Sequence, residues 1–212
     1  MNLYLIRHGE SEGNRLGKIQ GWSDFPLSEI GKKQALKLGD FFQGIQLDYL
    51  YSSDLTRAHD TALAIGSEKD LTVHKWEKVR EVNLGPFQGL SREEIYEHFP
   101  KVRETSILTS GIAGTESVHE LTERCKYVVD QLKRAHKNDH VAIVSHGGFI
   151  SIFLMYLMIG DNWGEFHRPF QIGNTSISHI ELSRPGKPLF HYINRDHHLS
   201  MEGMASKKMG LL

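Results

Sequence analysis

Short apolar runs alternate with stretches of helical periodicity along most of the chain. Six runs that are apolar or alternate apolar with polar residues predict β-strands. They cover residues 2–7, 47–53, 72–79, 141–145, 176–182 and 188–194. The connections between most of them are long enough for crossover helices, which predicts an α/β three-layer sandwich with a mostly parallel sheet and helices on both faces.

Helical periodicity and capping residues place the main helices. One helix is expected to begin after Ser28, with Ala35, Leu38, Phe41 and Phe42 on its apolar face. Asp54 is expected to cap the next helix, which should end near Gly66. A third should cover residues 117–135, and the apolar stretch 149–159 is too short to span a bilayer, so it predicts a core helix.

The last two predicted strands differ from the others because only a short turn at residues 184–186 separates them. They are therefore expected to form an antiparallel hairpin at one edge, which makes the sheet mixed. In open sheets of this kind, ligands bind beyond the carboxyl ends of the strands.

Length and charge limit the classes of function. The chain has 212 residues, enough for one domain with a sizeable core, and a net charge of −1. Because positive and negative residues are interspersed, the chain offers no basic face for nucleic acid, and nothing predicts a membrane partner. The single cysteine, Cys125, and the lack of a recognisable targeting segment lead us to expect a cytoplasmic protein, either a monomer or a homodimer.

Four polar clusters follow predicted strands and should meet at one edge of the sheet. They lie at residues 7–9, 51–61, 79–89 and 143–148. Each has an ordinary explanation when taken alone: Arg57 as a solvated residue at a helix start, Glu81 as a surface ion-pair partner, and His146 as a histidine near the core. The last cluster also faintly suggests an acyl hydrolase, but Ile143 occupies the place where a nucleophile elbow needs glycine.

Two histidines, two arginines and one carboxylate fit the chemistry of phosphoryl transfer. Guanidinium groups match phosphate oxygens in paired hydrogen bonds and balance the charge of a phosphate dianion. A neutral histidine can attack phosphorus when a hydrogen bond fixes its other ring nitrogen. The carboxyl group can then protonate the departing oxygen and later accept a proton from water.

These clusters together resemble the histidine phosphatase superfamily, in its phosphoglycerate mutase-like branch. The resemblance rests on RHGESEGN at residues 7–14, with Arg57, Glu81 and SHG at residues 145–147. It extends over nearly the whole chain through QGWSDFPLSEIGKKQA (20–35), SSDLTRA (52–58) and GNTSI (173–177). It implies a single domain over residues 1–212, with residues 89–116 as a lid-like insertion over the active site.

The resemblance also implies roles for individual residues. His8 would be transiently phosphorylated and Glu81 would be the proton donor. Contacts to the phosphoryl oxygens would come from Arg7, Arg57, His146, Asn14 and the backbone N–H of Gly147. Further candidates near the substrate are Ser11, Gln20, Gly21, Phe87 and Asn174.

The family works without a metal ion or an organic cofactor, so none is expected here. Mutases of this branch have a longer insertion after the proton-donating glutamate and follow it with a basic motif containing tyrosine. This chain instead has EVNLGPFQG at residues 81–89 and a compact connection to His146. We therefore expect a phosphatase that acts on a small phosphate monoester. A cofactor-dependent phosphoglycerate mutase and an inactive phospho-ligand-binding module stay open as alternatives.

The choice of substrate is expected to depend on the lid. Its apolar residues are Tyr96, Phe99, Ile107 and Leu108. The tail at residues 200–212 is expected either to fray or to fold over the crevice.

Overall fold

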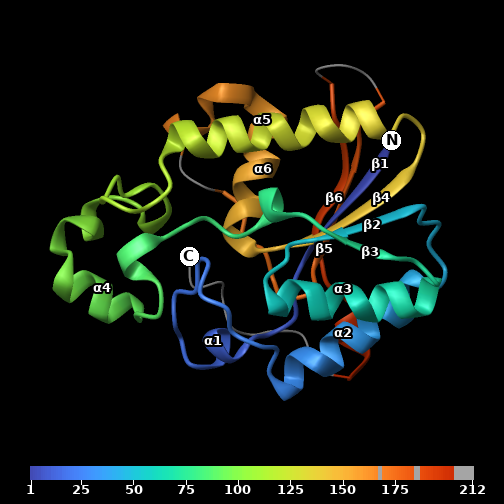
Figure 1. The fold of residues 1–212 in the computed structure, drawn as a ribbon, viewed down its shortest axis with the longest axis horizontal. Coiled ribbons are helices and arrows are strands. Elements are labelled where there is room, and N and C mark those ends of the chain that lie inside the picture. Colours follow the sequence, from blue (N-terminus) through green and yellow to red (C-terminus); the bar gives the residue numbers. More distant parts are fainter. Residues whose placement is uncertain (167–168, 184–186, 203–212) are drawn as a thin grey trace.

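A computed structural model, which describes residues 1–166, 169–183 and 187–202, places the chain's strands in one six-stranded sheet (Figure 1). The strands are β1 (Asn2–Arg7), β2 (Tyr49–Ser52), β3 (Val73–Lys75), β4 (His140–Ser145), β5 (Ile177–Glu181) and β6 (Leu189–Arg195). They lie in the order β3-β2-β4-β1-β5-β6. The pairs β3–β2, β2–β4 and β4–β1 are parallel, whereas β1–β5 and β5–β6 are antiparallel. The predicted mixed sheet with an antiparallel pair at one edge is confirmed.

Helices cover both faces of this sheet, as predicted. The helices are α1 (Glu12–Arg15), α2 (Glu29–Phe42), α3 (Thr56–Lys69), α4 (Arg92–His98), α5 (Val118–Ala135) and α6 (Gly147–Ile159). Figure 1 shows α5 and α6 on one side of the strands and α2 and α3 on the other. Within the described ranges, no helix combines the length and the apolar character needed to cross a bilayer.

The two-residue period of β1 explains why there are two cores. Leu3 and Leu5 belong to the apolar cluster that includes α5 and α6, whereas Tyr4 and Ile6 belong to the cluster that includes α2 and α3. Alternate side chains of a strand point to opposite faces, so a strand with consecutive apolar residues, such as 3–6 of β1, must be covered on both sides. Cys125 is fully buried in the first cluster, and burial raises the pKa of its thiol to about 12.

The predicted strand at residues 72–79 is too long. β3 ends at Lys75, and a turn of 3-10 helix follows over Glu77–Val79. The backbone N–H of Trp76 still donates to the carbonyl oxygen of Ser52 (2.7 Å), but the chain then turns so that Val79 is buried. Polar residues at 77 and 78 do not continue the apolar run, and that break was the signal for the strand's end.

The predicted cap of the helix after β2 is wrong. The N-cap residue of α3 is Leu55, and Arg80 binds the carboxylate of Asp54 through two N–H groups. Asp24, from a distant loop, instead accepts hydrogen bonds from the backbone N–H (2.8 Å) and the hydroxyl of Thr56. The helix end is therefore satisfied by tertiary structure rather than by its own sequence.

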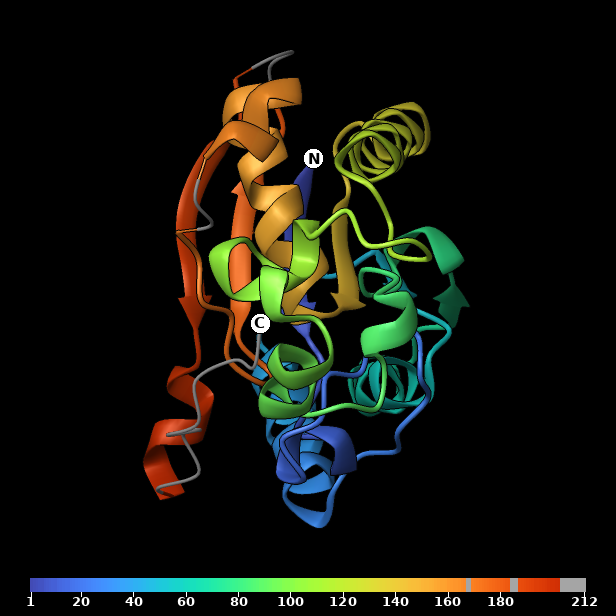
Figure 2. The same ribbon diagram turned by 90° about the vertical axis from the view of Figure 1, so that its left-hand side faces the viewer.

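Residues 89–116, which we call the lid segment after the role expected from the sequence, lie beyond the carboxyl ends of β1, β2 and β4 (Figure 2). They contain α4 and two short 3-10 helices, Pro100–Glu104 and Ile107–Thr109, and Figure 2 looks onto this end of the molecule with α4 in front. Ile107 and Leu108 are buried in the cluster that includes α6, so this segment is packed onto the body of the protein. The predicted turn at 184–186 and residues 203–212 of the predicted tail lie outside the described residues.

Candidate active site

The parallel strands β1, β2 and β4 end at the same edge of the sheet, and polar side chains surround a small cavity there. The cavity measures about 40 Å³, which suits a few water-sized atoms such as the oxygens of one phosphoryl group. Among its lining residues are Arg7, His8, Asn14, Lys18, Ile19, Gln20, Gly21, Arg57, Glu81, Gly147, Gly148, Phe170, Gln171 and Ile172. All four predicted clusters thus contribute lining residues, and the cluster after β2 does so through Arg57.

His8 directly follows β1 and has a fixed ring. Its backbone N–H donates to the carbonyl oxygen of Ser145 on β4 (3.0 Å), and its Nδ1 lies 2.6 Å from the carbonyl oxygen of Gly9. A carbonyl oxygen only accepts, so Nδ1 carries the proton and Nε2 has a free lone pair. Burial, with Arg57 and Arg7 nearby, holds the pKa of His8 well below its usual value. The ring is therefore neutral near pH 7 and chemically able to act as a nucleophile.

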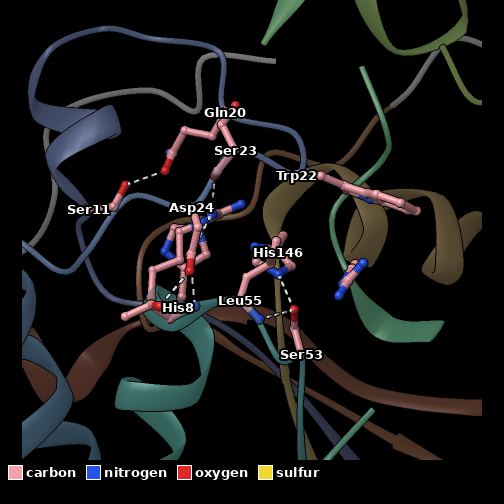
Figure 3. A network of polar contacts seen from close by, with 12 residues as sticks. His8, Ser11, Gln20, Trp22, Ser23, Asp24, Ser53, Leu55 and His146 are labelled. Atoms are coloured by element: carbon pink, nitrogen blue, oxygen red, sulfur yellow. Dashed lines mark hydrogen bonds and ion pairs between the residues drawn. The ribbon is translucent and has the colours of Figure 1, made fainter. Parts of the chain in front are cut away.

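His146 is completely buried beside His8, with the ring centroids 5.1 Å apart. Its Nε2 lies 2.8 Å from the hydroxyl oxygen of Ser53, which also accepts a hydrogen bond from the backbone N–H of Leu55 (Figure 3). This contact fixes the position of the His146 ring whichever of the two groups donates the proton. Nδ1 has no hydrogen-bond partner in the described part of the chain, although His146 is not among the residues that line the cavity. Burial also lowers the pKa of His146 well below its usual value.

Ser53→Ala should disturb the orientation of His146, because it removes the hydroxyl that contacts the ring. We expect kcat/KM for an aryl phosphate to fall by about tenfold, since small misplacements in an active site have effects of that size or larger. Ser53→Thr keeps the hydroxyl and should restore part of the loss. The matched control is Ser52→Ala, which removes a neighbouring buried hydroxyl that donates to the Ser53 carbonyl oxygen (2.6 Å). If both alanine variants lose the same activity, the effect is one of stability and not of His146.

Two buried arginines supply the positive charge of the site. Arg57, on the first turn of α3, is only 1% exposed, and its guanidinium donates to the carbonyl oxygens of Gly21 (2.8 Å) and Ser23 (3.0 Å). Burial lowers the pKa of Arg57 to about 10, so the group stays charged at neutral pH. Arg7 is also buried and donates from Nη1 to the carbonyl oxygen of Ile172 (2.5 Å). Two fixed guanidinium groups beside a small cavity favour an anion with several oxygens.

The carboxylate of Glu81 lies at the N-terminus of α6. One oxygen accepts from the backbone N–H groups of Val82 (2.9 Å) and Phe149 (2.8 Å), and the other accepts from that of Gly148 (3.1 Å). A Cβ atom at position 148 would lie 2.6 Å from the nearer oxygen, so glycine is required for this close approach. The indole N–H of Trp22 donates to the backbone carbonyl oxygen of Glu81 (2.7 Å) and holds the loop from the other side.

The weaker candidates divide into those at the cavity and those behind it. Gln20 and Gly21 line the cavity, as does Asn14. Ser11 and Asn174 lie in the layer behind. The hydroxyl oxygen of Ser11 lies 2.8 Å from the side-chain oxygen of Gln20 and 3.0 Å from that of Asn14 (Figure 3 shows the Ser11–Gln20 bond). The Asn174 side chain donates to the carbonyl oxygen of His8 (3.1 Å). These two residues therefore contact other residues of the site rather than the cavity itself.

Phe87 does not lie at the cavity, and its interpretation as a substrate contact needs correction. The side chain is fully buried and packs edge-on against Phe99 of the lid segment, with the ring centroids 5.1 Å apart. Its neighbours Val82 and Leu84 are equally buried in the same apolar cluster. Phe87 therefore packs in this core and is not among the residues that line the cavity.

Comparison with known proteins identifies the family. Residues 3–195 match the model of the histidine phosphatase superfamily, branch 1. The chain belongs to this superfamily. The matched range includes His8, Arg57, Glu81 and His146, so the predicted resemblance is confirmed.

Relatives of this histidine phosphatase include both phosphatases and mutases. It is 37% identical to phosphoserine phosphatase 1 of Hydrogenobacter thermophilus, over 86% of this chain and 87% of that protein. It is 28% identical to a probable phosphoglycerate mutase of Salmonella choleraesuis, over 85% of each. A histidine-to-alanine variant of Entamoeba histolytica phosphoserine phosphatase, solved with phosphoserine, superposes with a TM-score of 0.74 at 31% identity, covering 93% of this chain and 98% of that one. The chain is an enzyme, a phosphatase of this superfamily.

Several residues of the histidine phosphatase site were not predicted from its sequence. Ser53 and Lys18 both lie within or beside quoted motifs, and the segment 170–172 follows no predicted strand. Ser53 could have been found from its position, because it directly follows β2, which pairs with β4, and His146 directly follows β4. The segment 170–172 carries no such signal, since only the folded chain brings it to Arg7.

Proposed function

We propose that this phosphatase hydrolyses small organic phosphate monoesters through a phosphohistidine formed on His8, with Glu81 as the proton donor. The observation that supports this most strongly is the ring of His8. Its Nδ1 is bound to the carbonyl oxygen of Gly9, so Nε2 is the free nucleophile in a cavity that also holds two guanidinium groups and one carboxylate.

The reaction proceeds in two steps that balance. The Nε2 lone pair of His8 forms a bond to phosphorus while the bond between phosphorus and the ester oxygen breaks, and that oxygen takes the proton of the Glu81 carboxyl group. Water then attacks phosphorus, the P–N bond breaks, and the Glu81 carboxylate accepts the proton from water. Phosphate leaves, and both residues return to their starting states.

Arg7 and Arg57 are proposed to hold the phosphoryl oxygens through both half-reactions, together with Asn14, His146 and the backbone N–H of Gly147. Negative charge on those oxygens is balanced by groups already fixed in the cavity, which is the most effective form of electrostatic catalysis. Because protein cations supply this charge, the chemistry requires no metal ion.

A phosphoglycerate mutase is the second candidate, since the relative in Salmonella choleraesuis has that name. The phosphatase is favoured by the segment after Glu81, where Val82, Leu84 and Phe87 are all buried in the core and provide no cation to hold a phosphoglycerate. In a phosphatase, phosphorylated His8 meets water and not a second hydroxyl group.

The test compares three activities of the purified chain. We expect steady phosphate release from 4-nitrophenyl phosphate, at the same rate with and without EDTA. With 3-phosphoglycerate and catalytic 2,3-bisphosphoglycerate, phosphate release should outpace formation of 2-phosphoglycerate. Isomerisation that outpaces hydrolysis would identify a mutase, and phosphate binding without any turnover would identify an inactive binding module.

A further inference from the structure

Three cations line the cavity in the described part of the chain, and the proposed mechanism uses only two of them. The third is Lys18, whose side chain is 30% exposed, against 1% for Arg57. Lys18 therefore belongs to the open side of the cavity. If the phosphoryl group lies between the two buried arginines, as proposed, the rest of a substrate extends toward that open side.

The backbone of Lys18 is held between the cavity and the lid segment. The next residue, Ile19, donates its N–H to the carbonyl oxygen of Leu90 and accepts a hydrogen bond from the N–H of Gly89, both at 2.8 Å. Lys18 itself forms an isolated β-bridge with Ser91. These contacts fix where the lysine stem begins, whereas its four-carbon side chain keeps the freedom to reorient.

The ammonium group of Lys18 is paired with Glu94 on α4, with Nζ 2.8 Å from Oε2. Glu94 does not depend on this partner, because the same oxygen also accepts from the backbone N–H of Ser91 (2.5 Å) in the capping box of α4. Its side chain is 43% exposed, so water can replace Lys18. Ion pairs at such exposure contribute little to stability, and a better-placed anion can therefore compete for the lysine.

We propose that Lys18 exchanges Glu94 for a second anionic group on the leaving-group side of the substrate, and so selects phosphate monoesters that carry a carboxylate or a second phosphate. This inference rests on the proposed phosphatase reaction. Lys18 acts on specificity and not on the chemical step, since the reacting atoms lie between His8, Glu81 and the two arginines. Glu94 competes for Lys18 when the substrate is neutral on that side.

The test uses three substrates that share one carbon skeleton. Glycerol 3-phosphate has a hydroxymethyl group where 3-phosphoglycerate has a carboxylate and glycerol 1,3-bisphosphate has a second phosphate. In Lys18→Met, kcat/KM for at least one acidic substrate should fall about tenfold more than that for glycerol 3-phosphate, since charge-assisted contacts are the strong ones. The acidic substrate whose kcat/KM shows this larger fall identifies the anionic group as carboxylate or phosphate.

Two further variants separate the proposal from general electrostatics. Glu94→Gln removes the competing carboxylate. It should raise the ratio of kcat/KM for the preferred acidic substrate to kcat/KM for glycerol 3-phosphate by about two- to threefold. Lys32→Met removes an exposed cation on α2 that pairs with Glu29 away from the cavity, and it should leave the preference unchanged. The proposal is overturned if Lys18→Met lowers kcat/KM equally for all three substrates or changes it for none. The lysine would then only connect its loop to the lid segment.

This result is independent of the test of the proposed function. If the wild-type chain fails to hydrolyse 4-nitrophenyl phosphate, the proposed reaction itself is wrong. If it hydrolyses 4-nitrophenyl phosphate but its preference among the three esters does not depend on Lys18, only the specificity inference is wrong.

Discussion

His8→Ala is expected to abolish turnover. Without the imidazole there is no nucleophile to form the P–N bond, and the remaining groups can only bind and polarise the ester. When an enzyme loses its nucleophile, its kcat falls by several orders of magnitude. We therefore expect kcat to fall on the order of 10⁴-fold or more. The measurement is steady-state phosphate release from 4-nitrophenyl phosphate.

Binding should survive this substitution because Arg7 and Arg57 are anchored independently of His8. Their guanidinium groups are held by the carbonyl oxygens of Ile172, Gly21 and Ser23. Phosphoserine or inorganic phosphate should therefore still bind to the variant and raise its thermal midpoint. His8→Asn serves as a second variant, since its amide can still donate to the carbonyl oxygen of Gly9. Activity within tenfold of wild type in either variant would remove His8 from the mechanism.

Chemical trapping tests the same residue without mutation. A reaction with a radiolabelled ester, quenched rapidly in alkali and digested, should give label in the N-terminal peptide that contains His8. Label on any other peptide, during brisk catalysis, would contradict the proposed intermediate.

Glu81→Gln should have the second-largest effect, and its size should depend on the leaving group. A general acid contributes about 10²–10⁴-fold when the departing oxygen needs a proton. Alkyl phosphates such as glycerol 3-phosphate should therefore lose activity in that range, whereas 4-nitrophenyl phosphate, whose leaving group is stable as an anion, should lose far less. Equal losses for both esters would exclude Glu81 as the acid.

The comparison between esters also controls for stability. In the wild type, both carboxylate oxygens of Glu81 accept backbone N–H groups, including that of Gly148. The amide nitrogen of glutamine would place a donor against a donor there, with a cost of about 1–3 kcal/mol in the free energy of unfolding. A loss of folded protein affects all substrates alike, so only the ratio of the two activities reports on proton donation.

The strand ends could be predicted from the sequence because β1 and β4 have apolar centres, at residues 3–6 and 141–144, and then stop abruptly at polar residues. That pattern places Arg7, His8 and His146 at one edge of the sheet, as the structure has them. Arg57 was predictable in the same way, since it follows β2 at the start of a helix.

The errors arose where contacts distant in sequence decide the local structure. The pattern suggested that Asp54 would cap α3, but Arg80 binds Asp54 and Asp24 serves the helix instead. Phe87 was a candidate substrate contact because it lies just before the segment 89–116, although packing against Phe99 buries it. Lys18 gave no signal, since a lysine in a polar loop is ordinary until the lid segment is seen beside it.

The position of β1 in the sheet affects when the enzyme can first form during its synthesis. Leu5, three residues before the proposed nucleophile, pairs with Ile143 on one side and Ser178 on the other. A ribosome makes β1 first, yet both of its neighbours emerge only after most of the chain has been translated. The nascent N-terminal segment thus has to wait, unpaired and apolar, until β5 is available, and contacts of such long range also slow folding.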